Sequence, residues 1–210
     1  MIGDKMTNVT QGSDEWFASR LGKVTASRVE SILATTKTGV SASRKNYLAE
    51  LVCQRLTGEV EAGYVNAHME RGIELEPEAR AAYEFKYGVV VTEVSFVDHP
   101  SIEMTGASPD GLVGDDGLIE IKCPTAANHI ETLMADEAPK KYFAQMQWQM
   151  ACTGRQWVDF VSYCPSLGGK LDLFIKRVPR DDEYISQTEQ AVAEFLKEVY
   201  NLHMKLEAMK

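Results

Sequence analysis

The 210-residue chain has few of the residues that build zinc sites, disulfide frameworks or histidine-based metal centres. Its four cysteines, Cys53, Cys123, Cys152 and Cys164, lie far apart and form no Cys-x-x-Cys pair. This spacing disfavours a zinc site or a disulfide framework, so we expect reduced cysteines that act as small apolar side chains. The four histidines also show no metal-ligand spacing, and we expect structural or exposed roles for them.

Long hydrophobic runs are absent as well. No apolar run in the sequence approaches the roughly 20 residues that span a bilayer, and the segment 1–5 has no signal-peptide core. We therefore expect a cytoplasmic protein without membrane contact. Hydrophobic residues make up 44% and charged residues 25% of the chain, as in ordinary globular proteins. We expect one domain over 1–210, with a mobile stretch at 1–12 and a core over about 13–205.

Positive charge is scarce. The chain has 22 Lys and Arg against 31 Asp and Glu, which gives a formal net charge of −9. Proteins that simply bind nucleic acids normally present a basic surface, so this balance argues against that class. It does not exclude a nuclease, because bound Mg²⁺ reverses the sign of the field at its site and a few basic side chains can line a local channel.

Hydrophobic periodicity predicts an α/β protein with a central mixed β-sheet flanked by helices. Ser13 and Thr25 are expected to cap the first two helices, and Pro77 is a possible break in a later one. Helices are expected over 13–22, 25–33, 47–58, 67–88, 126–135 and 139–153 and from about 182 to the end. Strands are expected over 89–97, 157–164 and 171–178, and the Thr-, Ser- and Gly-rich stretch 35–43 predicts a flexible loop.

The most informative stretch is Ser108-Pro109-Asp110-Gly111, followed ten residues after its Asp by Glu120-Ile121-Lys122. Asp110 lies between Pro109 and Gly111, a sequence typical of a turn. Residues 114–117 predict a hairpin loop that returns the chain into a strand. Side chains at i and i+2 of a strand share a face, so Glu120 and Lys122 project together while Ile121 points into the core. The two carboxylates can therefore converge on one cation, with an ammonium beside them.

Such a pair of carboxylates suits Mg²⁺, which prefers a few oxygen ligands and keeps several waters. A metal of this kind, with a group that positions water, supports hydrolysis of phosphodiesters. The alternative is a surface hairpin whose Glu and Lys form an exposed ion pair of little energetic value.

The motif resembles that of the PD-(D/E)XK nucleases, and Asp110, Glu120 and Lys122 fall on its three positions. The wider sequence resembles the family of lambda-type exonucleases and YqaJ-type viral recombinases over about residues 10–200. Five blocks occur in the family's order: Trp16…Arg20-Leu21-Gly22…Thr25-Ala26-Ser27, Gly72…Glu76…Ala79-Arg80, Ser108-Pro109-Asp110-Gly111, Glu120-Ile121-Lys122-Cys123-Pro124 and Tyr142…Ala144-Gln145-Met146-Gln147. The resemblance implies a restriction-endonuclease-like core.

The same resemblance implies a Mg²⁺-dependent 5′→3′ exonuclease that starts at double-stranded DNA ends. The enzyme would digest one strand to 5′-mononucleotides and leave 3′ single-stranded tails for phage-type recombination, with Mn²⁺ able to replace Mg²⁺. A homotrimer, a partner that anneals single strands, and a bacterial or phage-infected host cell are implied too.

Roles for individual residues follow from the resemblance. Asp110, Glu120 and the Ile121 carbonyl would bind metal, and Lys122 would orient or deprotonate the attacking water. Glu76 and Gln145 would complete the site. Taken by themselves, Glu76 is also explained as a carboxylate stabilised at a helix start, and Gln145 as a solvated side chain.

A second group would hold the terminal 5′-phosphate of the substrate. Arg20, Thr25 and Ser27 place a guanidinium and two hydroxyls at a helix start, which is good geometry for an anion. Ordinary helix capping explains the same residues. The resemblance favours the phosphate and adds Ser108. It also aligns Lys37 with a residue that follows the DNA and Met69 with a wedge that splits terminal base pairs.

Two other functions are compatible with the motif. A restriction-like or repair endonuclease would use the same metal site, and it would cut covalently closed circles. A catalytically inert relative that binds DNA or a protein partner would usually have lost one of the three motif residues. Asp110, Glu120 and Lys122 are all present, which disfavours the inert alternative.

Overall fold

The computed structural model describes residues 9–36, 39–60 and 67–210, without the side chains of 67–69. Its helices are α1 (Asp14–Arg20), α2 (Val29–Leu33), α3 (Ala42–Thr57), α4 (Ala67–Tyr87), α5 (Ala126–Ala135), α6 (Phe143–Thr153) and α7 (Asp182–Glu207). Its strands are β1 (Val24–Thr25), β2 (Thr35–Thr36), β3 (Gly39–Val40), β4 (Val91–Thr92), β5 (Val97–Asp98), β6 (Thr105–Ala107), β7 (Gly111–Val113), β8 (Gly117–Lys122), β9 (Trp157–Tyr163) and β10 (Leu173–Pro179). Short 3₁₀ turns lie at Ala26–Arg28, Lys140–Tyr142, Pro165–Leu167 and Gly169–Leu171.

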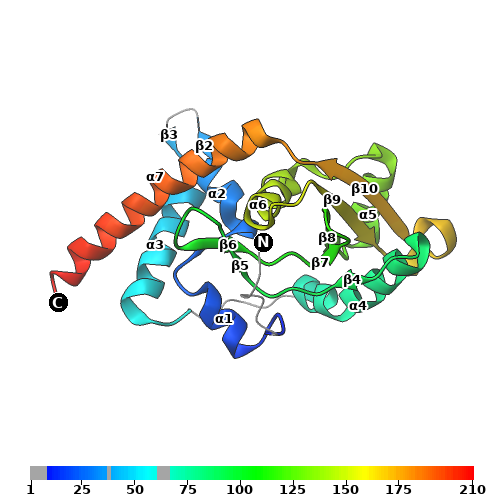
Figure 1. Cartoon of the computed structure of the whole chain (residues 1–210), viewed down its shortest axis with the longest axis horizontal. Helices are drawn as coiled ribbons and strands as arrows, with labels where there is room; N and C mark the ends of the chain where they lie inside the picture. Colours follow the sequence, from blue (N-terminus) through cyan, green and yellow to red (C-terminus); the bar gives the residue numbers. More distant parts are fainter. Residues whose placement is uncertain (1–8, 37–38, 61–66) are drawn as a thin grey trace.

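A five-stranded sheet in the order β10-β9-β8-β7-β4 forms the centre of the fold (Figure 1). The β8–β9 pair is parallel, and the other pairs are antiparallel. Parallel strands need a crossover connection, and α5 and α6 supply it between β8 and β9. The sheet is therefore mixed and flanked by helices, which confirms the α/β architecture expected from the sequence.

Each face of this sheet has its own hydrophobic core, because successive side chains of β8 and β9 alternate between the faces. On one face, Ala79 and Tyr83 of α4 pack against Ile119, Ile121 and Val161. On the other face, Leu118, Val158 and Phe160 pack with the buried residues of α6. Glu120 and Lys122 share the face of Leu118, so α6 lies over them.

A second, three-stranded sheet in the order β1-β6-β5 continues into the central one. β1 pairs in parallel with β6, with Thr25 opposite Gly106. The chain leaves β6 at Ala107 and enters β7 at Gly111, so residues 108–110 connect the two sheets. This connection places the Ser-Pro-Asp segment between the N-terminal elements and the central sheet.

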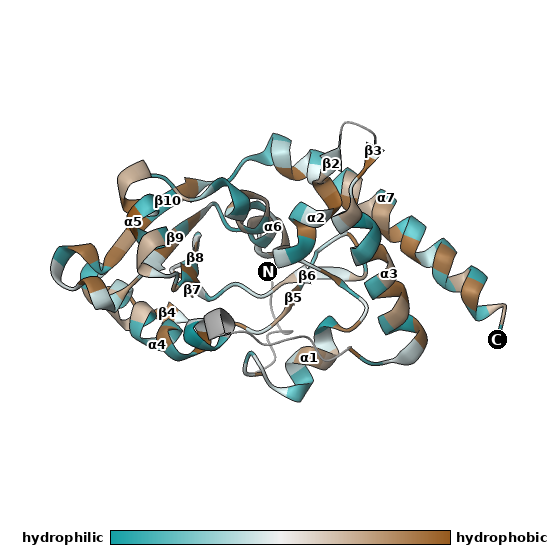
Figure 2. Cartoon of the chain, turned by 180° about the vertical axis from the view of Figure 1, so that it is seen from behind, coloured by the Kyte–Doolittle hydropathy of each residue, from teal (hydrophilic) through white to brown (hydrophobic). Residues whose placement is uncertain are grey.

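The helices α2, α3 and α7 pack against the same core as α6. As expected from its periodicity, α7 buries Ile185, Val192, Phe195 and Val199, while Leu196 and Leu202 are partly buried. Figure 2 shows the resulting change between hydrophobic and hydrophilic residues along α7. Arg44 of α3 donates two hydrogen bonds of 2.9 Å to the Glu198 carboxylate of α7 and joins the two helices at the surface.

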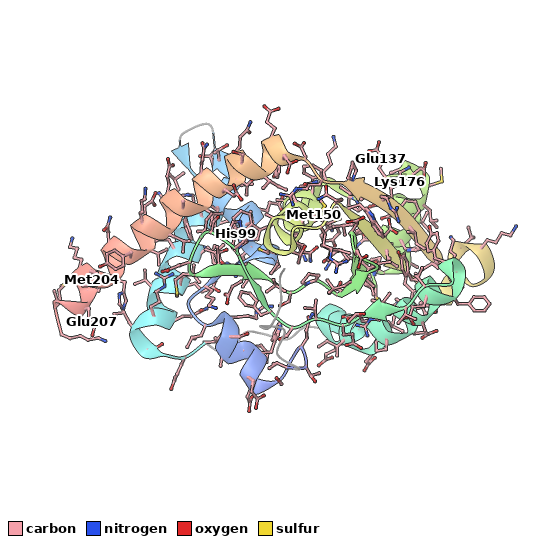
Figure 3. All side chains as sticks on the ribbon, viewed as in Figure 1. His99, Glu137, Met150, Lys176, Met204 and Glu207 are labelled. Atoms are coloured by element: carbon pink, nitrogen blue, oxygen red, sulfur yellow. The ribbon has the colours of Figure 1, made fainter. Side chains whose placement is uncertain are left out.

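Several local expectations are confirmed. Ser13 caps α1 by accepting a hydrogen bond from Trp16 N, and Gly58 ends α3 with a left-handed backbone. The described cysteines are free thiols. His99 has a structural position beside α6, where its ring stacks on Trp148 with centroids 5.0 Å apart (Figure 3). Among the residues that the structure describes, no helix is long and apolar enough to cross a bilayer.

Three local expectations were wrong, and a fourth was right only in part. Thr25 is the N-cap residue of the 3₁₀ turn that leads into α2, but its side chain makes no capping hydrogen bond. Helix α4 continues through Pro77, since packing of the following turns on the sheet overrides the local preference. The stretch 89–97 cannot be one strand, because β4 belongs to the central sheet and β5 to the second one. Within 35–43 the chain forms the β2–β3 pair and then begins α3.

Candidate active site

The β7–β8 hairpin brings the two acidic residues of the motif together. Gly111 of β7 pairs with Ile119 of β8, and one further step in this register puts Asp110 opposite Glu120. Side chains directly opposite in an antiparallel pair have Cβ atoms about 4.5–5.5 Å apart. The Asp110 carboxylate is fixed in this place because its Oδ2 accepts a 2.6 Å hydrogen bond from Ile121 N.

Glu120 is fully buried and is held by three side chains. Its Oε1 accepts from the Lys122 ammonium and, at 2.6 Å, from Gln145 Nε2. Its Oε2 accepts from Gln149 Nε2, also at 2.6 Å. The expected pairing of Glu120 and Lys122 on one face is therefore confirmed. Glu120 does not lie at an open surface as an exposed ion pair would, because α6 covers it.

The electrostatics of the site follow from two carboxylates in a region of low solvent access. Burial raises the pKa of Asp110 well above its usual value, and the nearby Glu120 raises it further. Burial lowers the pKa of Lys122, but Glu120 and Asp110 more than offset this, so the net shift is upward. The site therefore favours a cation between the carboxylates, and the Lys122 side chain is held as an ammonium.

A cavity of about 480 Å³ opens above these groups, and its lining includes Glu76, Asp110, Ile121, Lys122 and Tyr142. Two close carboxylates next to a strand carbonyl form an oxygen-rich set that fits a hard divalent cation with several waters. Within the described residues, no group of three or more His, Cys, Asp or Glu side chains is placed to hold a metal. A bound ion would therefore depend on the two carboxylates, the backbone and water.

Glu76 of α4 reaches the same cavity from the other side of the sheet. Its Oε1 accepts a 2.7 Å hydrogen bond from Arg80, and burial raises its pKa, with a smaller contribution from Glu120. The interpretation of Glu76 as an isolated helix-start carboxylate does not fit this position. The structure brings together all six residues expected at the metal site, since Gln145 also contacts Glu120.

Arg20 and Ser108 meet at the end of α1, where Ser108 Oγ accepts hydrogen bonds from Trp16 Nε1 at 2.9 Å and from Arg20 at 3.4 Å. The Arg20 guanidinium also lies over the Trp16 ring, 3.8 Å from its centroid. Burial lowers the pKa of Arg20 to about 10, which still leaves it charged at neutral pH. Arg20 forms no ion pair within the described part of the chain, so an anion would complete this pocket.

Thr25 and Ser27 line the same cleft as Arg20, which has a volume of about 750 Å³. Their hydroxyls lie 3.4 Å apart. Ile73 and Glu76 line both this cleft and the cavity above Asp110, so the two spaces adjoin. Lys37 lies outside the described residues, and the side chain of Met69 does too, so the expected DNA contacts of these two residues stay predictions.

The sequence interpretation did not predict the role of Gln149 or the hydrogen bond from Trp16 to Ser108. Gln149 follows Gln145 by one helical turn, and glutamines on one helix face are usually solvated. The i, i+4 spacing of Gln145 and Gln149 was the available signal, because it puts both amides over one side of a helix. The Trp16–Ser108 contact joins residues 92 apart in sequence, and no local pattern indicates it.

Comparison with known proteins places this geometry in context. Residues 15–156 match the family model described as YqaJ-like viral recombinase domain. No curated protein matches the chain. LHK-Exo, an alkaline exonuclease from Laribacter hongkongensis, is 53% identical, with a TM-score of 0.87 over 94% of this chain and 97% of that one. The structure of LHK-Exo in complex with dAMP is 54% identical, with a TM-score of 0.88 over the same shares.

A phage-related exonuclease from Haemophilus somnus 129PT is 17% identical, with a TM-score of 0.67 over 90% of this chain and 96% of that one. At this identity the likeness shows a common fold and nothing more. The fold of the central sheet and its helices is therefore shared by exonucleases whose sequences have diverged widely.

The repulsion between Asp110 and Glu120 predicts the effect of removing one charge. Because its ionised carboxyl is disfavoured in the folded state, Asp110→Asn should stabilise the metal-free protein at neutral pH, while the amide oxygen still accepts from Ile121 N. We expect the melting temperature in EDTA to rise by a few degrees, since about 1 kcal/mol shifts it by roughly 2–4 °C in a protein of this size.

Asp115→Asn, in the exposed turn of the same hairpin, is the matched control and should leave the melting temperature unchanged. Differential scanning calorimetry measures both. A lower melting temperature for Asp110→Asn than for the wild type would show that the two carboxylates do not destabilise each other.

Proposed function

This chain belongs to the YqaJ-like viral recombinase domain family, and from that premise we propose that it is a Mg²⁺-dependent 5′→3′ exonuclease. It would digest one strand of double-stranded DNA to 5′-mononucleotides and leave 3′ single-stranded tails. The family and the nuclease activity expected from the sequence are supported by the match to LHK-Exo. One observation supports the proposed 5′→3′ direction and the release of mononucleotides. The Arg20 cleft adjoins the Asp110 cavity, and the two share Ile73 and Glu76 in their linings.

Bound at Asp110, Glu120 and the Ile121 carbonyl, Mg²⁺ would supply an activated water and offset charge on the phosphate, and Mn²⁺ would replace it. Lys122 contributes a fixed positive charge beside the reacting phosphate. Its upward-shifted pKa favours orientation of water and stabilisation of charge over removal of a proton. Gln145 positions Glu120 through its hydrogen bond to Oε1, while Glu76 closes the cavity on the side of the cleft.

The proposed 5′→3′ direction follows from the positions of the Arg20 cleft and the adjoining Asp110 cavity. A 5′-phosphate in the Arg20 cleft would be paired with a guanidinium that has no ion-pair partner among the described residues. The next phosphate of the same strand would then lie in the adjoining cavity, above Asp110. Attack by water at that phosphorus would break its bond to the 3′ oxygen of the terminal nucleotide. The terminal nucleotide would leave as a 5′-mononucleotide with a 3′ hydroxyl, and the phosphate would remain as the new 5′ end of the shortened strand. The dAMP bound to LHK-Exo is a nucleotide of this kind.

The assembly and partners are proposed on the same premise. A closed ring of three copies would keep DNA enclosed despite the net charge of −9, and a protein that anneals single strands would receive the 3′ tails. The place of action would be the cytoplasm of a bacterial or phage-infected cell. The competing function, a restriction-like or repair endonuclease, needs no pocket for a terminal phosphate, so the Arg20 cleft favours the exonuclease.

Substitution of the motif residues tests the chemistry. Asp110→Ala, Glu120→Ala and Lys122→Ala should each lower the rate of nucleotide release from linear duplex by roughly 100-fold or more, because each removes charge stabilisation at the reacting phosphate. Release of acid-soluble label with Mg²⁺ measures the rate, and circular dichroism checks the fold.

Lys141→Ala is the matched control for Lys122→Ala, since both ammonium groups lie near the Tyr142 ring, at 5.0 and 5.3 Å from its centroid. It should retain a rate within a few-fold of the wild type. A folded motif variant that digests DNA at the wild-type rate would remove that residue from the mechanism.

The preference for 5′-phosphate over 5′-hydroxyl ends tests whether the Arg20 cleft binds the terminal phosphate. A duplex with 5′-phosphate ends should be digested roughly tenfold faster than one with 5′-hydroxyl ends, since a charge-assisted contact to phosphate contributes about 1.5–3 kcal/mol. Arg20→Ala should erase most of this preference. Arg28→Ala should keep it, because Arg28 lines the same cleft but is already paired with Glu50 at 2.9 Å.

Equal rates on both ends in the wild type would leave the cleft without a role in end recognition. Cutting of covalently closed circles at a comparable rate would favour the endonuclease instead.

Light scattering tests the assembly. At micromolar concentration the protein should have the mass of a homotrimer, three times the 23.4 kDa of one chain. A monomer that stays on one DNA molecule after addition of excess competitor DNA would show that a ring is not needed.

A further inference from the structure

Gln149 lies in α6 one helical turn after Gln145, and both amides point at the same carboxylate. Gln145 Nε2 donates to Glu120 Oε1 and Gln149 Nε2 donates to Glu120 Oε2, each at 2.6 Å. Gln149 is fully buried, whereas Gln145 is partly exposed. The two glutamines therefore hold the two oxygens of Glu120 from different depths.

The donors are distributed unequally between the two oxygens. Oε1 accepts from both Lys122 and Gln145, which occupies both lone pairs of that oxygen. Oε2 accepts from Gln149, and the described residues supply no other donor to it. One lone pair of Oε2 is thus left for a cation, and its direction is set by the Gln149 amide.

The other end of the Gln149 amide supports this interpretation. Its own Oε1 is buried and has no hydrogen-bond partner among the described residues. An unsatisfied buried acceptor costs about 1–3 kcal/mol, so a residue selected for stability alone would not be expected here. The amide cannot turn over to relieve this cost, because its oxygen would then face the carboxylate.

Gln147, on the opposite side of the same helix, shows what a structural glutamine looks like in this fold. It is also buried, its Nε2 donates to Pro179 O and its Oε1 accepts from Asp181 N, both at 2.9 Å. Both ends of Gln147 are satisfied by backbone groups that join α6 to the end of β10. Gln149 instead donates its single hydrogen bond to the Glu120 carboxylate.

We propose that Gln149 is a positioning residue that aims Glu120 Oε2 at the bound divalent cation. This role rests on the proposed function, since it assumes that Glu120 is a metal ligand. It assigns different tasks to the three donors. Lys122 lines the cavity and Gln145 is partly exposed, so both can interact with substrate, whereas Gln149 is inaccessible and acts through Glu120 alone.

Gln149→Met tests the proposal, because Met is similar in size and cannot donate the hydrogen bond. Groups that orient a metal ligand typically contribute 10–100-fold to metal affinity. We expect Mn²⁺ to bind the variant at least tenfold more weakly, measured from the free Mn²⁺ signal in electron paramagnetic resonance without DNA. The Mn²⁺ concentration for half-maximal digestion should rise equally, while the rate at saturating Mn²⁺ should approach that of the wild type.

Gln147→Met is the matched control, with the same substitution in the same helix at equal burial. It should lower the melting temperature and leave Mn²⁺ affinity unchanged. If circular dichroism shows that Gln149→Met does not fold, Gln149→Asn replaces it, because withdrawal of the amide by one methylene also breaks the 2.6 Å contact.

The possible outcomes separate the two claims. If the wild type binds Mn²⁺ and the folded Gln149 variants bind it equally well, the positioning role is wrong and the proposed function stands. If Gln147→Met weakens Mn²⁺ binding to the same extent, the effect of Gln149→Met reflects a general loss of stability. This outcome would also overturn the positioning role of Gln149. A wild type that digests DNA with Mg²⁺ but binds no Mn²⁺ through Glu120 would remove the metal ligand on which the role depends.

Discussion

The repulsion between two carboxylates, Asp110 and Glu120, is the constraint on which the arrangement of the surrounding side chains depends. The hairpin register sets them opposite each other, and burial prevents water from screening the pair. Hydrogen bonds from Ile121 N, Lys122, Gln145 and Gln149 hold the two groups in place, and of these donors only Lys122 carries a charge that offsets part of theirs. A site of this kind destabilises the protein that carries it and gains free energy when a cation binds.

The rest of the fold relates this pair to a second charged site. Because β1 and β6 run in parallel, the segment after β1 and the segment after β6 end on the same side. Ser108, which follows β6, accepts a hydrogen bond from Arg20, while Asp110, two residues later, accepts one from Ile121 N beside Glu120. Residues 108–110 thus set the spacing between the proposed anion pocket at Arg20 and the proposed cation site at Asp110. The proposed exonuclease would need a fixed spacing of this kind to cut one nucleotide from an end.

The parts that could be predicted from the sequence are those decided by local geometry. The hairpin, the shared face of Glu120 and Lys122 and the buried stripe of α7 follow from periods of two and 3.6 residues. Thr25 occupies the expected N-cap position, although its side chain makes no capping hydrogen bond. The single strand assigned to 89–97 was wrong because pairing between distant segments divides it between two sheets. Gln149 was missed for the same reason, since its burial depends on how α6 crosses the sheet. Family resemblance supplied the roles of Glu76, Gln145 and Arg20, which no local pattern specified.

The claim at the centre of this account is that Asp110 and Glu120 together form a cation site. Anomalous diffraction from a crystal soaked in millimolar Mn²⁺ locates such a site directly. The account predicts one strong peak within bonding distance of Asp110, of Glu120 Oε2 and of the Ile121 carbonyl, while Lys122 and Gln145 stay on Glu120 Oε1. A strong peak elsewhere in the molecule, with no density at Asp110 and Glu120, would contradict it.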